Sequence, residues 1–543
     1  MAYTKQTWAD LPSKTTPINA ERLTHIEDGI FNAAQTADTA ASTAGTAAAN
    51  VGIVSGKVET LTERVNGLDT AVSNKVDKVA GKGLSTNDYD NTDKGKVDSL
   101  GTASTKNSTS VVASSTDLVE SGAVKAYIDE IHGHRIYGFH IKANESDPDS
   151  MVTYLADAVD ATPAHMDYTN NAFDYGTWEN AFFMPKPCML KSDGTVDYYL
   201  NPSDYTKKED GTASDVANTA YDGNAMMEWG QNGKKIWMKI QPDSNHLGAS
   251  VFIADYQVDA TYHDWSFHNC QGVSVDHFYT PIFNGAKDSN NKLRSISGQQ
   301  VSNKTTANQE IAYARANNPG SNVLWDIEHY SDITLINMLL ILMAKTVDLP
   351  TAFGQGLRDS GSEAINNAFR TGVHNTKGLF YGTNSGAAAT YSNAVKVFGM
   401  ENWWGFQWRR YVGHVLVDGV HKVKNTFLTE DGSTATDYVV NGEPTGAGFK
   451  SIPATVLSGT SGNYIKYEWF DDDGMVPCGE LTGSDTTYYC DGCWYNNSGV
   501  RVPFRGGTSS GGAKDGAFSV YLNNPASHSA WGFGAAVSCK PLA

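Results

Sequence analysis

The sequence predicts an α+β protein in which an elongated N-terminal helical coiled-coil stalk is followed by a large head. Three observations predict this. Residues 1–132 hold one Trp, no Cys and many Ala, Thr and Ser, whereas the rest of the chain is dense in aromatic residues and Gly. A heptad spacing of apolar residues lies in the first part. Short alternating strand-like segments and one long apolar helix lie in the second.

Residues 1–50 are predicted to contain an N-terminal helix. In the stretch "TPINAERLTHIEDGIFNA", the pair Thr16 and Pro17 is typical of a helix start. The apolar side chains of Leu23, Ile26 and Ile30 then fall on one face of that helix. So few apolar residues cannot form a conventional core, so this part must be elongated, oligomeric or both.

Residues 51–80 are predicted to form a coiled coil, because their apolar residues are spaced 4, 3, 4, 3 and 4 apart. These are Val54, Val58, Leu61, Val65, Leu68 and Val72. An amphipathic helix docked on a core is the alternative, but no nearby core exists to receive it. Val at heptad position a with Leu at position d is associated with two-stranded coiled coils, and the heptads alone do not decide between a dimer and a trimer.

Residues 81–132 read as a polar shaft or linker of short segments broken by Gly. A short helix is expected in "SGAVKAYIDEI", entered from Ser121.

Residues 133–543 form the predicted head. The segments "KKIWMKI" and "YIKYEWF" alternate as half-buried strands do, and Asp193-Gly194 is a hairpin signal. The stretch "SDITLINMLLILMAKT" predicts a helix with Ser331 as N-cap, Asp332 in the first turn and Lys345 near the end. Many short strands with few helices and Gly-rich loops favour an α+β head.

Composition and charge exclude several functions. The net charge of −19 argues against a nucleic-acid partner, since Lys and Arg do not cluster. No apolar run reaches the length of a bilayer span, so membrane insertion is not expected. The N-terminus lacks a secretory signal, which predicts synthesis in the cytoplasm. The six Cys are expected to be reduced, and no nucleophile elbow, P-loop or dinucleotide fingerprint is present.

Four motifs have a structural and a functional interpretation. The aromatic stretch "VFGMENWWGFQWRRYVG" (397–413) predicts a core turn, with a sugar-stacking platform as the alternative. The pair Cys490 and Cys493 has zinc-knuckle spacing without a second ligand pair, so no metal is expected. The run 471–473 is expected to be a solvated acidic turn rather than a calcium loop. Hydrogen-bonding roles are expected for the histidines of one loop, namely His263, His268 and His277.

The N-terminal region resembles bacteriophage tail fibre and baseplate-associated proteins. The resemblance rests on "TWADLPSKTTPINAERLTHIEDGI", "NKVDKVAGKGLSTNDYDNTDKGKVDSL" and "LVESGAVKAYID", which occur in that order. It implies that this region attaches the protein to phage tail or baseplate proteins and assembles it as a homotrimer. It also implies a location in the virion tail after synthesis in the bacterial host cytoplasm.

The head resembles the C-type lectin fold of the formylglycine-generating-enzyme type. The segments that carry this likeness are "VFGMENWWGFQWRRYVG", "RVPFRGG" and "WGFGAAVSC". Formylglycine-generating enzymes use two closely spaced cysteines late in the chain, whereas here Cys539 stands alone in that region. This departure argues against oxidase activity, and neither a catalytic residue nor a cofactor is expected.

The last 45 or so residues, about 494–543, resemble the variable region of proteins that diversity-generating retroelements diversify at template adenines. Tyr, His, Ala, Gly and Ser are reachable from an AAC codon by changing its adenines only, whereas Trp and Lys are not. The resemblance implies a receptor-binding set with two exceptions to this codon rule. Trp531 belongs to the scaffold of the site, and Lys514 either derives from an AAA-type template codon or is a fixed residue. The set is Ser509, Ser510, Gly511, Lys514, Tyr521, His528, Ala530, Trp531 and Gly532. The implied fixed frame is Arg505, Gly506, Gly507, Phe518, Asn523 and Asn524. In this frame the glycines are expected to permit unusual backbone dihedrals and the asparagines to satisfy buried backbone groups.

These resemblances imply a phage tail receptor-binding protein, not an enzyme, whose hypervariable lectin-like surface binds a bacterial cell-surface receptor, either protein or glycan. Two alternatives remain. A tail-associated glycan hydrolase would need a carboxylate pair. A purely structural tail fibre subunit would show no special tolerance for substitution at the closing positions.

Overall fold

The computed structural model describes residues 134–269, 272–319, 324–359, 361–425 and 449–541. The expected N-terminal helix, coiled coil and polar shaft (1–50, 51–80 and 81–132) lie outside the described residues. The described part is mainly β, with 33% of it in strands and 13% in helices, and its sheets are largely antiparallel. The many short strands and few helices expected for the head are therefore confirmed.

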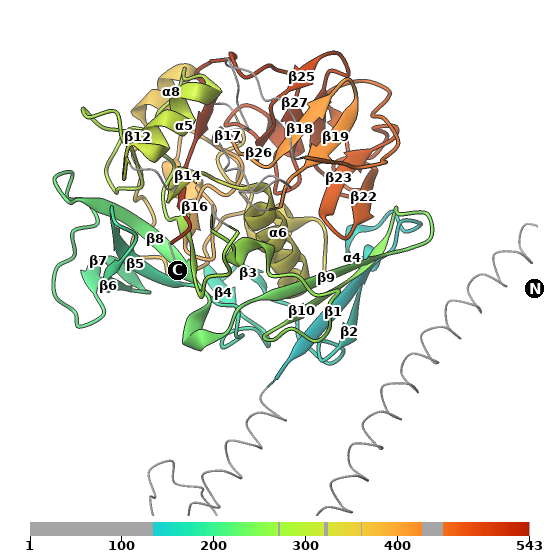
Figure 1. Ribbon diagram of the computed structural model, residues 1–543, viewed down its shortest axis with the longest axis horizontal. Coiled ribbons are helices and arrows are strands. Elements are labelled where there is room, and N and C mark those ends of the chain that lie inside the picture. Colours follow the sequence, from blue (N-terminus) through green and yellow to red (C-terminus); the bar gives the residue numbers. More distant parts are fainter. Residues whose placement is uncertain (1–133, 270–271, 320–323, 360, 426–448, 542–543) are drawn as a thin grey trace, which may run out of the picture. The chain divides into compact units, whose positions relative to one another are not determined.

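Two sheets are built mainly from the first half of the head (Figure 1). The four-stranded sheet has the order β2-β1-β10-β9, and all of its neighbours are antiparallel. Its strands are β1 (Ile136–Ile141), β2 (Val152–Ala156), β9 (Trp237–Pro242) and β10 (Ala249–Ala254). The seven-stranded antiparallel sheet has the order β14-β29-β11-β8-β5-β6-β7. Its strands are β5 (Lys186–Lys191), β6 (Val196–Asn201), β7 (Asp204–Lys208), β8 (Gly223–Trp229), β11 (Phe278–Pro281), β14 (Trp325–Ile327) and β29 (Val537–Cys539).

The second half of the head contributes two further sheets. The six-stranded sheet has the order β21-β24-β27-β26-β17-β28 and contains two parallel pairs. Its strands are β17 (Trp408–Arg410), β21 (Asn463–Tyr464), β24 (Gly492–Tyr495), β26 (Phe504–Arg505), β27 (Val520–Leu522) and β28 (Phe533–Ala535). The remaining four-stranded sheet comprises β18 (His414–Val417), β19 (Val420–Val423), β20 (Lys450–Ser451) and β25 (Val500–Arg501).

Four strand pairs stand apart from these sheets. They are β3 (His165–Asp167) with β4 (Ala172–Asp174), β12 (Ala286–Lys287) with β13 (Leu293–Arg294), β15 (Lys396–Val397) with β16 (Met400–Glu401), and β22 (Tyr467–Asp471) with β23 (Gly474–Cys478). The helices are α4 (Pro148–Met151), α5 (Ala307–Arg315), α6 (Tyr330–Ala344), α7 (Leu349–Phe353) and α8 (Glu363–Ala368). The predicted strand segments are confirmed in β9 and β22, each beginning about three residues later than the quoted stretch.

The predicted hairpin at Asp193-Gly194 joins β5 to β6. Gly194 has a φ of +84°, which Gly adopts without steric cost. The Asp193 carboxylate accepts hydrogen bonds from the backbone and hydroxyl of Thr195, as turn residues of this type do.

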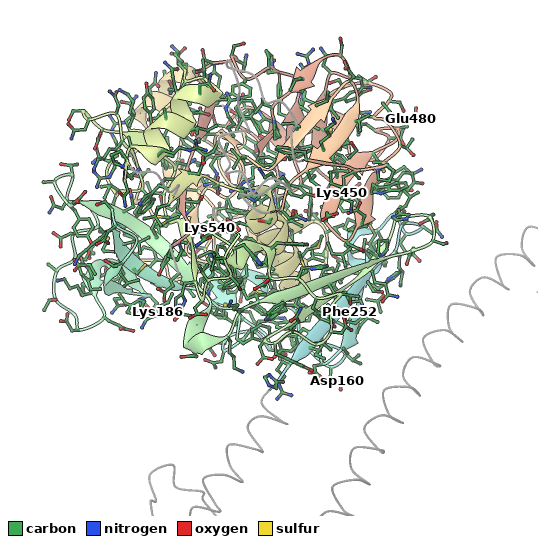
Figure 2. All side chains as sticks on the ribbon, viewed as in Figure 1. Asp160, Lys186, Phe252, Lys450, Glu480 and Lys540 are labelled. Carbon is green, nitrogen blue, oxygen red and sulfur yellow. The ribbon has the colours of Figure 1, made fainter. Side chains whose placement is uncertain are left out.

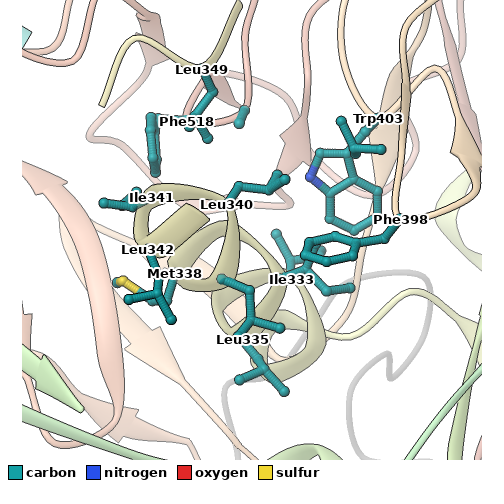
Figure 3. Packing of buried hydrophobic residues seen from close by; sticks show 14 of the residues in the cluster. Ile333, Leu335, Met338, Leu340, Ile341, Leu342, Leu349, Phe398, Trp403 and Phe518 are labelled. Carbon is teal, nitrogen blue, oxygen red and sulfur yellow. The ribbon is translucent and has the colours of Figure 1, made fainter. Parts of the chain in front are cut away.

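The long apolar helix α6 lies at the centre of the head, and all fifteen of its residues are buried. Figure 3 shows its side chains packed against Phe398, Trp403, Leu349 and Phe518. A helix that is apolar on all sides is stable only when other elements surround it, as here. No helix among the described residues has the length and apolarity that a membrane crossing needs.

The expected N-cap of α6 was wrong by two residues. His329 is the N-cap, and its Nδ1 accepts a hydrogen bond from the backbone N–H of Ser331 (3.2 Å). The helix ends as expected at Lys345, the C-cap, whose φ is +56°. Asp332 lies in the first turn, where it pairs with the buried Lys540 (2.5 Å). Figure 2 labels Lys540 near the middle of the head and Asp160 and Glu480 at its periphery.

The described chain enters the head beside a buried carboxylate. Asp255, which follows β10, accepts a hydrogen bond from the backbone N–H of Arg135 (3.1 Å). It also pairs with His134 (3.0 Å) and Lys234 (2.5 Å). These contacts join the start of β1 to the end of the neighbouring strand and to the segment before β9.

Candidate functional site

The register of the six-stranded sheet places several aromatic residues of the closing segment on one face. Tyr521 is paired with Trp494 on one side and with Phe504 on the other. On the adjoining strands, Trp408 is paired with Phe533. Because paired residues of neighbouring strands point to the same side and alternate residues share a face, these rings lie on one side of the sheet.

We call this side the aromatic face and define it by Trp408, Trp494, Phe504, Tyr521 and Phe533. Trp408 meets Trp494 edge to face, with ring centroids 5.2 Å apart. Tyr521 lies 5.4 Å from Trp408, 6.0 Å from Trp494 and 5.3 Å from Phe533. Trp408 and Phe504 are buried, whereas Trp494, Tyr521 and Phe533 are partly exposed. Large amphipathic rings held in this way favour ligand contact.

His528 adjoins the aromatic face through its own ring. Its imidazole meets Phe533 edge to face at 4.7 Å, and its carbonyl accepts a hydrogen bond from Arg410 (3.0 Å). Burial and, to a smaller extent, the charge of Arg410 lower the pKa of His528. The imidazole is therefore neutral at pH 7. Arg410 itself is fully buried, stacked over Phe504 and bonded to Glu310 (2.6 Å).

The opposite side of the same strands is a buried ionic frame made by Arg505, Arg409 and Glu328. Arg505 donates to Glu328 (2.5 Å) and to the carbonyl of Trp403 (2.9 Å), and it lies over the Trp403 ring. Arg409 Nε is 3.3 Å from the second Glu328 oxygen. Burial, followed by the charge of Arg505, lowers the pKa of Arg409 to about 9. Removing one partner of a buried ion pair leaves an uncompensated charge, which is strongly destabilising. The strands that carry Arg409 and Arg505 are therefore held against Glu328.

The loop 508–516 is held by the buried Asp515. Its carboxylate accepts a hydrogen bond from the backbone N–H of Thr508 (2.7 Å). Burial raises the pKa of Asp515 well above its ordinary value. Gly506 and Gly507 have φ values of +84° and +80°, which confirms the expected use of glycine there. A Cβ at Gly507 would lie 2.1 Å from the Asp515 carboxyl carbon.

The structure places Ser509, one of the expected receptor contacts, in the interior of the head. Its side chain is fully buried, and its hydroxyl donates to Asn366 (2.5 Å). Its backbone bonds to Phe406 (2.9 Å) and Gly361 (2.6 Å). Ser509 therefore fastens the loop to the core, and a larger side chain would have no room there.

Gly511, which is also expected to vary, is partly exposed but packs closely against Asp515. A Cβ there would lie 2.1 Å from both carboxylate oxygens of Asp515. Ser510 beside it is exposed, as a receptor-contacting residue must be. Lys514 is partly exposed, and its ammonium group donates to the carbonyl of Gly462 and lies 5.3 Å from the ring centre of Tyr464.

The last three positions of the expected set lie directly before β28. Ala530 and Trp531 are partly exposed. Gly532 is buried, yet a Cβ there would meet only Thr508, with Oγ1 at 3.1 Å and Cβ at 3.9 Å. Gly532 therefore has more room for a Cβ than Gly511, provided that the Thr508 hydroxyl shifts slightly.

Within the expected frame, the side chains of Arg505 and Phe518 are buried. The two asparagines act differently from the expectation that their side chains satisfy buried backbone groups. Asn523 makes a long contact with the Tyr521 hydroxyl (3.5 Å), and Asn524 contributes its backbone carbonyl, which accepts from Val502 (3.0 Å).

The motif interpretations have separate outcomes. In 397–413 the core-turn prediction is confirmed, because Trp403 and Trp404 are buried and Glu401 accepts hydrogen bonds from the backbone of Gly372 and His374 (2.8 Å each). Asn402 differs, since its side chain donates to another side chain, that of Asn284.

The five described cysteines are free thiols, and all are buried. No three His, Cys, Asp or Glu side chains in the described ranges gather as metal ligands would. The acidic run 471–473 forms the turn between β22 and β23, where Asp473 pairs with Lys450. His268 and His277 bond to backbone carbonyls as expected, and His263 stacks on Trp265 (4.4 Å).

Sequence reasoning missed Trp494 and Phe533 as parts of the site, and it included Trp408 only through the alternative of a sugar-stacking platform in 397–413. Their short strands carry too few residues to show alternation clearly, and the pairing that joins them is long-range. The signal that could have located Trp494 is its position two residues after the start of a strand-like "GCWY" segment.

No protein-family model matches this chain, and no match is found among curated proteins.

Proposed function

We propose that this protein is a phage tail receptor-binding protein and that its aromatic face binds a ligand on the bacterial surface. One observation carries the proposal. Tyr521 lies within the aromatic face, and His528 and Gly532 lie beside its Phe533 and Trp408, and all three are residue types that an AAC template codon can reach. The buried ionic frame behind the face supports it further, because side chains in front can change while the backbone stays fixed.

The proposal includes the finer architecture. The head is a C-type-lectin-like domain with its variable region at about 494–543, and the N-terminal region attaches to phage tail or baseplate proteins and forms a homotrimer. Three copies of a weak site would raise overall affinity through multivalency. The protein is not an enzyme in this proposal. Two carboxylates contributed near the closing strands are buried and engaged: Glu310 pairs with Arg410, and Asp515 accepts a hydrogen bond from the backbone N–H of Thr508.

The test is adsorption of the labelled full chain to a panel of bacterial strains. Tyr521→Ala is expected to weaken binding to the adsorbing strain, since the ring is partly exposed at the centre of the face. Phe252→Ala is the matched control, because Phe252 is a half-buried ring on β10 of another sheet (Figure 2). Equal adsorption of both variants and the unaltered chain would contradict the proposal.

A second test concerns the gene. Sequencing its 3′ end across a population should show variation at the codons of Ser510, Tyr521, His528 and Gly532, together with a nearby template copy that differs at adenines. Invariant codons and no template copy would favour a purely structural fibre subunit. Release of sugars from host surfaces by the purified chain would favour the glycan hydrolase.

A further inference from the structure

Trp494 has an unusual seat for a partly exposed tryptophan. A Cβ at Gly462 would lie 2.6 Å from the indole Nε1, and a Cβ at Gly492 would lie 2.8 Å from the far edge of the six-membered ring. Two glycines from two segments therefore make room for one side chain. No L-residue with a Cβ fits at either position without moving the indole.

The neighbours of Trp494 fix its ring on the sheet side. Its centroid is 5.2 Å from Trp408, edge to face, and 6.0 Å from Tyr521, with an angle of 21° between the ring planes. Trp408 is itself buried, so it provides a rigid wall. The indole thus has a single position and keeps part of its surface in solvent.

Trp494 lies directly beside one of the expected variable residues, Tyr521. It is the strand partner of Tyr521, so the two side chains stand next to each other on one face. Its seat is made by Gly462 and Gly492, which lie before the expected variable region of about 494–543. The part of the seat that these two glycines provide therefore does not change when the closing residues, Tyr521 among them, change.

Resting on the proposed function, we infer that Trp494 is the constant anchor of the receptor site, on which the ligand packs an apolar face whatever side chains occupy the variable positions. Binding hot spots are enriched in tryptophan. A rigidly held indole offers a large contact area at little cost in side-chain entropy. Residues such as Tyr521 and His528 then decide which ligand of this kind is accepted. Every ligand of the site must present an apolar patch that covers the indole.

The experiment measures binding of the full chain to cells of the adsorbing strain. Trp494→Ala should lower the affinity at least about tenfold, and Trp494→Phe should lower it less, because a ring remains in the seat. Gly492→Ala should also lower the affinity, since its methyl group pushes the indole from its position.

Trp469→Ala is the matched control. Trp469 is another half-buried tryptophan, stacked on His246 in the β22–β23 hairpin (4.5 Å). Near-ultraviolet circular dichroism and thermal melting establish that each variant is folded, and if Trp494→Ala unfolds, the comparison rests on Trp494→Phe and Gly492→Ala. Unchanged binding by the folded Trp494 variants while Tyr521→Ala binds weakly overturns the anchor and leaves the proposed function standing. Unchanged binding by all of these variants, Tyr521→Ala included, overturns both.

Discussion

Gly511 and Gly532 should respond oppositely to the same substitution, although the codon argument treats them alike. Gly511 has φ −85° and ψ −15°, a conformation open to alanine, so the backbone is no obstacle. The obstacle is Asp515, whose buried carboxylate would lie 2.1 Å from the new methyl carbon. Moving it costs about 1–3 kcal/mol for overpacking and about 1–3 kcal/mol for the amide of Thr508 left without its acceptor.

Replacing glycine by alanine also lowers the conformational entropy of the unfolded chain, which stabilises the folded state by about 0.4–1 kcal/mol. Gly511→Ala should therefore lower the free energy of unfolding by about 1–6 kcal/mol. Gly532→Ala should change it by less than about 1 kcal/mol, because Thr508 needs to move only a few tenths of an ångström.

The assay is urea unfolding of the full chain followed by tryptophan fluorescence. A double-mutant cycle with Asp515→Ala identifies the cause, since removing the carboxylate should make Gly511→Ala nearly neutral. Equal losses at the two glycines, or a Gly511 penalty that persists without the Asp515 carboxylate, would show that the clash is not what excludes side chains at Gly511.

Three further predictions concern the core behind the face. Arg505→Met should cost about 3–5 kcal/mol of unfolding free energy, because Glu328 is left buried without its closest cation, and equilibrium unfolding measures it. Ser509→Tyr should abolish the bond to Asn366 and lower the melting temperature, whereas a tyrosine at exposed Ser510 should leave it unchanged. Burial raises the pKa of Glu468 well above its ordinary value, so the stabilisation from its protonated form is complete below the unfolded pKa and is lost as pH rises through the raised pKa. Glu468→Gln cannot ionise, and its melting temperature should exceed that of the unaltered chain by a margin that grows from mildly acidic to mildly alkaline pH.

Local chemistry explains which elements were predictable from the sequence. The hairpin at Asp193-Gly194 needs only its own turn residues, and the predicted turn is the observed one. The helix at 330–344 was evident from its apolar run, but its start was misplaced because Ser331 is a stronger capping residue by type than His329. The choice between them depends on the His329 imidazole, which accepts a hydrogen bond from the backbone N–H of Ser331 two residues later. General preferences for capping residues do not predict this contact.

The site was less predictable because its decisive contacts are distant in the chain. Arg505 and Glu328 are 177 residues apart, and nothing in either neighbourhood announces the pair. Ser509 and Gly511 satisfy the codon rule, yet Asn366 and Asp515 determine that neither position accepts a larger side chain. Whether a codon can change to encode a residue and whether the fold has room for that residue are separate conditions. The second depends on contacts between distant segments, which the sequence alone does not reveal.

The junction at Asp255 bears on how the head resists mechanical force. If the chain is pulled at His134, the force first acts on the contacts of Asp255. Its carboxylate accepts a hydrogen bond from the backbone N–H of Arg135 and pairs with the side chains of His134 and Lys234. Next comes β1, which is hydrogen-bonded to β2 on one side and β10 on the other. Extraction of β1 must therefore break two ladders together with the clamp, and the point where the chain enters is reinforced against peeling.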